Sequence, residues 1–128
     1  NDDKQLAEHV ERSLKALSGA IKRSPVGMLS AALVLNNQYI SRVEFAVVGN
    51  APARADFLNV IYSSYLPYRV IAASDKADDR VALLKGRDVI SGSENGATGY
   101  VCQNYVCKLP APGVEEFAKQ VAALSAAL

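Results

Sequence analysis

The sequence predicts an α/β protein, in which an N-terminal αα-hairpin precedes a small, mainly parallel sheet of three to four strands with flanking helices. Two patterns carry this prediction. Up to residue 40, apolar residues recur every three or four positions, as they do on one face of a helix. Beyond it, short continuous apolar runs alternate with helical patterns, which is the order that βαβ units produce. We therefore divide the chain into a helical hairpin, residues 1–40, and a C-terminal α/β domain, residues 41–128.

The hairpin is expected to consist of two helices separated near Ser24–Pro25, a pair that suits the N-cap and the first position of a helix. The second helix should stop near Asn36–Asn37. The apolar faces comprise Leu6, Val10, Leu14 and Leu17 in the first helix, and Met28, Leu29, Ala32, Leu33 and Leu35 in the second. Faces as broad as these need further partners, so we expect the hairpin to bind another surface or to self-associate.

The α/β domain is expected to contain three buried strands, at Val43–Val48, Arg69–Ala73 and Thr98–Gln103. A short fourth strand could form near Val106–Leu109. Right-handed crossovers between parallel strands favour the order 2-1-3. The expected helices are Ala53–Tyr65, with Tyr65 facing inward, Asp79–Lys85 and Gly113–Ala126. The predicted core consists of Val47, Phe57, Ile61, Val70, Ile71, Val101, Phe117 and Val121.

Composition and charge exclude two classes of partner. The net charge is +1 and no cluster of Lys or Arg appears, so no nucleic acid is expected to bind. No run reaches the roughly 18 apolar residues that a membrane span needs, so no membrane partner is expected. The chain starts without Met and without the basic-then-apolar layout of a secretory signal. We therefore expect it to be the C-terminal portion of a longer protein.

A candidate ligand loop lies at Gly49–Asn50, where the first strand meets the following helix. In open α/β sheets this edge is the usual ligand crevice, because helix N-termini point free amide groups there. A small anion or nucleotide would suit it. However, the loop contains no glycine-rich phosphate motif, and Pro52 removes one amide donor. An ordinary turn is therefore the favoured interpretation of Gly49 and Asn50.

No catalytic residue, metal site or cofactor is predicted. Asp75, Asp78 and Asp79 do not match the spacing of a calcium loop, and we interpret them as part of a solvated loop that caps the next helix. His9 is the single histidine and has no nucleophile near it in the sequence, so we expect it at the surface.

The two cysteines, Cys102 and Cys107, form the candidate thiol site. In a straight strand their odd spacing puts them on opposite faces, with Cα atoms roughly 16 Å apart, which is beyond the reach of a disulfide. Two reduced, buried thiols are therefore the favoured interpretation. A disulfide would require a bend at Asn104–Tyr105. A metal site or a redox dithiol remains a further alternative.

Several segments together resemble one known family in the same order along the chain. They are Arg23–Pro25, Met28–Leu33, Val43–Gly49, Tyr65–Pro67 and Gly99–Pro110, and the last, with its Tyr-Val-Cys-x-Asn-x-x-Cys-x-x-Pro pattern, is the most specific. The chain resembles, over nearly its whole length, the C-terminal part of thioredoxin-domain proteins related to spermatogenesis-associated protein 20. It departs from them at Gly49–Asn50, where the family has Gly-Asp.

The resemblance implies a longer parent protein. Such a parent has a thioredoxin-like domain, then an (α/α) toroid similar to glycosidases and N-acylglucosamine 2-epimerases, then a terminal α/β segment. The chain would be a non-catalytic accessory domain whose partner is the rest of its own parent chain. The alternatives are a ligand-binding or enzymatic module that uses the loop at 49–52, or a dithiol redox site at Cys102 and Cys107.

Overall fold

The computed structural model describes residues 2–40, 42–104 and 106–125. The chain divides into two compact units, Asn1–Ile40 and Ser41–Leu128. Among the described residues, no helix combines the length and the apolar character that crossing a membrane requires.

The first unit is the expected helical hairpin, made of α1 (Asp2–Arg23) and α2 (Leu29–Tyr39). Two details differ from the prediction. Residues 25–28 form a turn, so Met28 rather than Ser24 occupies the N-cap position of α2. Helix α2 also continues past Asn36, because the Ile40 amide still donates to the Asn36 carbonyl.

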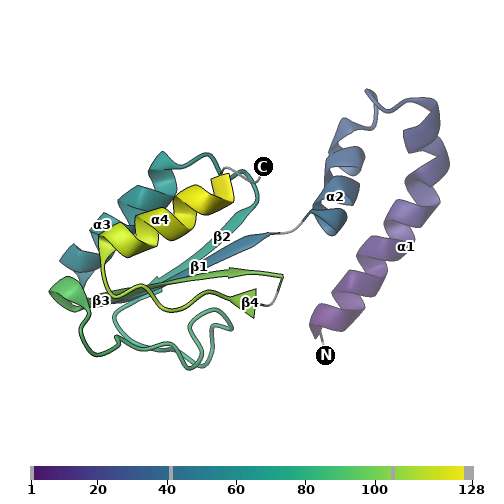
Figure 1. Cartoon of the computed structure of the whole chain (residues 1–128). Coiled ribbons are helices and arrows are strands. Elements are labelled where there is room, and N and C mark those ends of the chain that lie inside the picture. Colours follow the sequence, from purple (N-terminus) through teal and green to yellow (C-terminus); the bar gives the residue numbers. More distant parts are fainter. Residues whose placement is uncertain (1, 41, 105, 126–128) are drawn as a thin grey trace. The chain divides into compact units, whose positions relative to one another are not determined.

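The second unit is a four-stranded sheet with flanking helices, as Figure 1 shows, and it confirms the α/β fold class. The strand order β2-β1-β3-β4 contains the predicted order 2-1-3. The predicted fourth strand is present but short, and Ala126, the expected end of the last helix, lies outside the described residues. The elements are β1 (Val43–Gly49), α3 (Ala51–Ser63), β2 (Arg69–Ser74), a 3₁₀ turn η1 (Glu94–Gly96), β3 (Ala97–Gln103), β4 (Val106–Cys107) and α4 (Val114–Ser125).

The direction of the third strand differs from the prediction, so the sheet is mixed rather than mainly parallel. Strand β2 runs parallel to β1, but β3 runs antiparallel to it and starts where β1 ends, with Ala97 opposite Gly49. The reason lies in the segment 75–93. Residues 79–85, expected as a helix, form turns instead. A β3 parallel to β1 would need a crossover connection that carries the chain from the end of β2 back to the opposite end of the strands, and a series of turns does not supply one.

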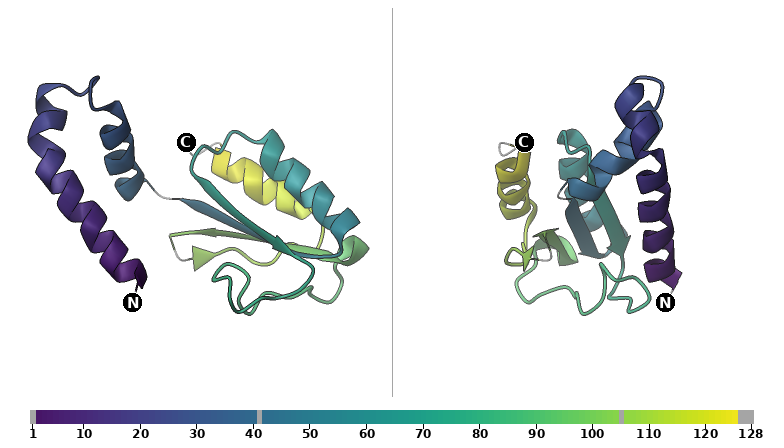
Figure 2. Two further views of the ribbon diagram at one scale, coloured as in Figure 1. Left: turned by 180° about the vertical axis from the view of Figure 1, so that it is seen from behind. Right: turned by 90° about the vertical axis from the view of Figure 1, so that its right-hand side faces the viewer.

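One face of the sheet packs against α3 and α4, which lie side by side on it (Figures 1 and 2). Its centre is aromatic: the ring of Phe117 on α4 lies 6.0 Å from that of Phe45 and 5.1 Å from that of Phe57, measured between centroids. Gly99 on β3 leaves room for these rings, because a Cβ there would come within 2.4 Å of Phe117. The buried residues of this core are Val43, Phe45, Val47, Ala53, Phe57, Ile61, Leu66, Ala97, Val101, Ala111, Phe117, Val121 and Leu124.

Most of the predicted core is confirmed, but Ile71, Val70 and the inward-facing position predicted for Tyr65 differ from the structure. Ile71 is only partly buried against the core. Val70 is 41% exposed, since it lies on β2, at the end of the sheet order, where burial is least. Tyr65 is 82% exposed because α3 ends at Ser63, before the position at which Tyr65 would have turned inward.

The other face of the sheet is partly covered by the segment 75–93. Leu84 from this segment is buried with Ala46, Val48 and Tyr100 in a second, smaller cluster. Thr98 anchors the segment further along, since its Oγ1 accepts a hydrogen bond from the Ile90 amide at 3.0 Å. The absence of helical structure between residues 75 and 93 is therefore compensated by contacts with β1 and β3.

Candidate functional site

The turn at Gly49–Asn50 is held by hydrogen bonds within the protein. Asn50 is the N-cap of α3, and its side-chain oxygen accepts from the Ala53 amide at 3.1 Å. Its side-chain nitrogen donates to the Asn95 carbonyl at 2.7 Å, and its own amide donates to the Gly96 carbonyl at 3.2 Å. The amides that an anion would have used at Asn50 and Ala53 are therefore already donating to protein groups.

The charged side chain of Arg54, at the start of α3, also bonds to groups of the protein. Arg54 donates from Nη1 to the Gly49 carbonyl at 2.6 Å, and the same nitrogen forms an ion pair with Asp75. The guanidinium of Arg54 thus joins β1 to the loop after β2. The bonds at the turn therefore connect β1, α3 and the neighbouring loops, which is a structural role.

Replacing Asn50 by alanine should lower the free energy of unfolding by about 1–2 kcal/mol, because both the N-cap bond and the bond to the Asn95 carbonyl are lost. Urea denaturation followed by circular dichroism measures this loss. Asn59→Ala, an exposed position within the same helix, is the matched control and should change stability by less than about 0.5 kcal/mol. Equal losses in the two variants would contradict the capping role of Asn50.

In the predicted acidic loop, Asp78 pairs with an arginine of the same segment. Asp78 accepts from Arg80 at its carboxylate, with Nη2 at 2.8 Å from Oδ2, and also from the Arg80 amide. These hydrogen bonds, the side-chain one first, lower the pKa of Asp78 to about 2. The expectation that the aspartates cap a helix is wrong, since only turns follow them. Among the described residues, no group of three or more His, Cys, Asp or Glu side chains is placed to hold a metal ion.

His9 lies at the surface of α1, as expected. Its ring nitrogen Nδ1 is 2.8 Å from the Gln5 carbonyl one helical turn earlier.

The cysteines differ from the favoured prediction. Cys102 and Cys107 face each other as register partners between β3 and β4 and form a disulfide, with Cα atoms 3.9 Å apart. The chain reverses after Gln103, where Asn104 has a φ of 52°, a conformation that asparagine adopts more readily than most residues. Tyr105 lies outside the described residues. The prediction of two reduced, buried thiols is therefore wrong: Cys102 is buried but Cys107 is exposed.

Arg87 is the site residue that the sequence analysis did not identify. Its Nη2 lies 3.1 Å from Sγ of Cys102 and 3.2 Å from Sγ of Cys107. The guanidinium is held there by a bond from Nη1 to the Leu83 carbonyl and by the ring of Tyr100, whose centroid is 5.7 Å from Cζ. No spacing rule connects Arg87 to the cysteines, because the contact depends on the path of the segment 75–93.

Tyr100 and Lys108 complete the surroundings of the disulfide. The hydroxyl of Tyr100 donates to the Asp88 carbonyl, and burial raises the pKa of Tyr100 above its usual value. Lys108, the basic residue next to Cys107 in the sequence, donates instead to the Gln120 carbonyl at 3.1 Å. The cation on the sulfur atoms is thus Arg87.

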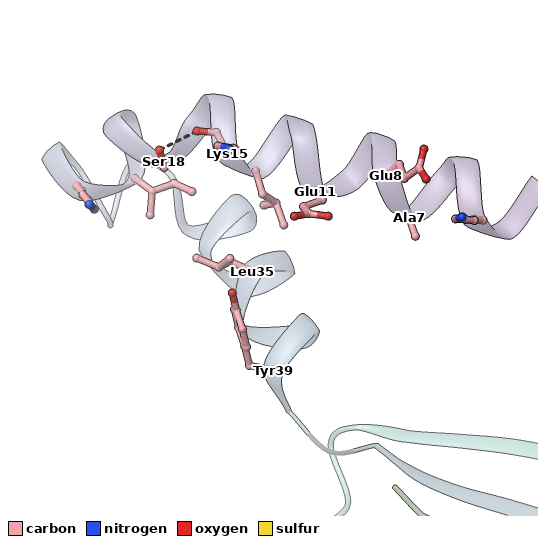
Figure 3. A pocket seen from close by; sticks show the side chains of 11 residues that line it. Ala7, Glu8, Glu11, Lys15, Ser18, Leu35 and Tyr39 are labelled. Carbon is pink, nitrogen blue, oxygen red and sulfur yellow. Dashed lines mark hydrogen bonds between the residues drawn. The ribbon is translucent and has the colours of Figure 1, made fainter. Parts of the chain in front are cut away.

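A groove of about 680 Å³ lies between α1 and α2 within the first unit. Figure 3 shows Glu8, Glu11 and Lys15 of α1 beside it, with Leu35 and Tyr39 of α2 on the other wall. Both signs of charge line the groove, from Glu8 and Glu11 and from Lys4, Lys15 and Lys22, so its charge selects no class of ligand. Ala7, Leu14, Ile21 and Leu35 are the apolar part of its lining.

No family model, no curated protein and no solved structure matches the chain. The resemblance to the thioredoxin-domain proteins therefore stays a prediction from the motifs quoted above.

Proposed function

We propose that the chain is a non-catalytic accessory part of a longer protein, and that its helical hairpin is the surface that binds the rest of that protein. The observation that carries this proposal is the exposure of the hairpin. Among residues 4–37, 39 and 40, whose side chains are described, none is buried. Large apolar side chains stand open on both helices, including Leu6 at 66% exposure and Leu29 at 59%.

An uncovered helical hairpin of this kind gains little stability from its own contacts. Most helical stability in proteins comes from packing an apolar face, and burying apolar surface contributes about 25 cal/mol per Å². Leu33 and Val34 of α2 are also half exposed, so the apolar surface extends over much of the short helix. A covering surface would supply the missing stabilisation.

The partner that we propose is the helical part of the same longer chain. A toroid is built from helical hairpins that pack on one another, and the motif resemblance places the last such hairpin at residues 1–40. The α/β domain would then be the terminal unit carried by this hairpin. Its turn at Gly49–Asn50 gives less support to the ligand-binding alternative, because the amides of Asn50 and Ala53 donate within the domain.

The chain produced without its partner should therefore self-associate through the hairpin. In sedimentation equilibrium, we expect a reversible association that Leu33→Glu weakens at least about tenfold, because the substitution places a charge on the apolar face. Ser30→Glu adds the same charge at an exposed polar position of the same helix and is the matched control. It should leave the association nearly unchanged.

The experiment has clear contrary outcomes. A strictly monomeric chain whose hairpin amides are as protected from hydrogen exchange as those of β1 would contradict the proposal. Equal effects of Leu33→Glu and Ser30→Glu would show that charge, rather than the apolar face, governs the association.

A further inference from the structure

The two cysteines of the disulfide differ in exposure. Cys102 is 2% exposed and lies on β3 inside the sheet, whereas Cys107 is exposed on β4, the last strand in the sheet order. Its neighbour Val106 is 70% exposed, and Leu109 is 84% exposed. A reagent can therefore approach Cys107 between exposed neighbours, whereas Cys102 is buried.

A guanidinium against both sulfur atoms favours the reduced state of this pair. A disulfide is neutral, so it gains little from a neighbouring cation. A thiolate is an anion, and a charge-assisted hydrogen bond from arginine stabilises it strongly. Nη2 of Arg87 is within 3.2 Å of each sulfur, so it is already in place for whichever thiolate forms.

The other charges around the pair do not replace Arg87. Glu44 is the register partner of Cys102 on β1, and its negative charge opposes a thiolate at that position. The ammonium group of Lys108 donates to the Gln120 carbonyl. The Tyr100 phenol stays neutral near neutral pH, because its pKa is raised above the usual value of 10.0.

We infer that Cys102 and Cys107 form a thiol–disulfide exchange site that takes electrons from a dithiol, with Cys107 as the attacked sulfur and Arg87 as the residue that stabilises the Cys102 thiolate as it leaves. This inference does not depend on the accessory role proposed above.

The exchange proceeds in two balanced steps. A thiolate of the external dithiol attacks Sγ of Cys107, a mixed disulfide forms, and the electron pair of the broken bond stays on Cys102 as a thiolate. The second thiol of the reductant loses its proton and then attacks the reductant's first sulfur, which is bonded to Cys107 in the mixed disulfide. This step releases Cys107 as a thiolate. The dithiol is oxidised to a disulfide, and the two cysteines, once they have taken up two protons, are reduced to thiols.

Contacts other than the disulfide hold the segment after β4 to the sheet, and they do not depend on the bond between the two sulfur atoms. The segment after β4 is held by the Lys108 amide, which donates to the Val101 carbonyl at 2.9 Å, and by a bridge between Gly99 and Ala111. The aromatic core lies on the other face of the sheet. Reduction should therefore leave the circular dichroism spectrum and the cooperative melting of the domain in place.

The role of Arg87 is tested by reducing the full chain with dithiothreitol and quenching with acid at timed intervals. We expect Arg87→Gln to slow reduction about tenfold, and Arg87→Lys, which keeps the charge, to retain most of the rate. Arg80→Gln lies in the same segment and removes an arginine far more exposed than Arg87, so it is the matched control and should react like the natural chain. In glutathione buffers, Arg87→Gln should also lower the reduction potential of the disulfide. A tenfold change in the equilibrium constant of reduction corresponds to about 30 mV.

The role of Cys107 is tested on the natural chain, which makes the inference independent of whether the Arg87 variants fold. The reduced protein is treated with less than one equivalent of iodoacetamide, and the labelled peptides are counted by mass spectrometry. Labelling of Cys107 at least about tenfold ahead of Cys102 supports the assignment. Equal labelling, loss of the fold on reduction, or equal reduction rates in Arg87→Gln and Arg80→Gln would overturn it and leave a structural disulfide.

Discussion

Truncating Phe117 to alanine should lower the free energy of unfolding of the α/β domain by about 3–5 kcal/mol, which is most of what a small domain possesses. Phe117 is fully buried and is the ring that joins α4 to Phe45 on the sheet and to Phe57 on α3. Its removal leaves a cavity among three elements that cannot all move inward together, so the loss includes unfilled space as well as lost burial.

Urea denaturation followed by circular dichroism checks this expectation. Tyr65→Ala removes a similar aromatic side chain from a position that is 82% exposed, and it should change stability by less than about 0.5 kcal/mol. A cost below about 1 kcal/mol for Phe117→Ala would mean that the aromatic cluster is not the centre of the core.

The second large effect is expected from Gly49→Ala, which should destabilise the domain by roughly 3 kcal/mol or more. Gly49 has a φ of 143°, and a Cβ there would lie 2.3 Å from the Gly96 carbonyl oxygen and 2.5 Å from Cα of Ala97. Both are backbone atoms at the start of β3, so no side-chain rotation relieves the overlap. The substitution would force β1 and β3 apart at the end where they first pair.

Gly86→Ala separates the effect of space from that of backbone conformation. Gly86 also has a positive φ, of 65°, but an added Cβ would meet no atom within 4 Å. Its cost should therefore be about 1–2 kcal/mol, the ordinary price of a left-handed conformation. Equal melting temperatures for Gly49→Ala and Gly86→Ala would show that the close approach of β3 to Gly49 is unimportant.

Local patterns predicted the elements of the fold, and they failed where a contact between distant segments decides the structure. The apolar runs around Phe45, Val70 and Val101 predicted the strands, because short continuous apolar runs bounded by turns are typical of buried strands. Residues 79–85 were expected as a helix but form turns. There the burial of Leu84 against the sheet and the bond from Ile90 to Thr98 fix a non-helical path, and no periodicity records either contact.

The disulfide and its arginine illustrate the same limit at the candidate site. The spacing of Cys102 and Cys107 excludes a disulfide in a straight strand, and only the left-handed conformation of Asn104 brings the two cysteines opposite each other. Asparagine was a visible signal for that reversal, although a weak one. Nothing in the sequence indicated that Arg87 contacts the cysteines, because this contact depends on the non-helical path of the segment 75–93.

The position of Phe117 has a consequence for the protein as it is being synthesised. Phe45 and Phe57 leave the ribosome long before α4, and the ring against which both pack belongs to α4, the last helix among the described residues. Until α4 emerges, the sheet face beneath it is an apolar surface without its cover. A nascent chain that stops before Val114 therefore presents both rings to solvent or to a chaperone, and the domain can complete its core only after α4 has been translated.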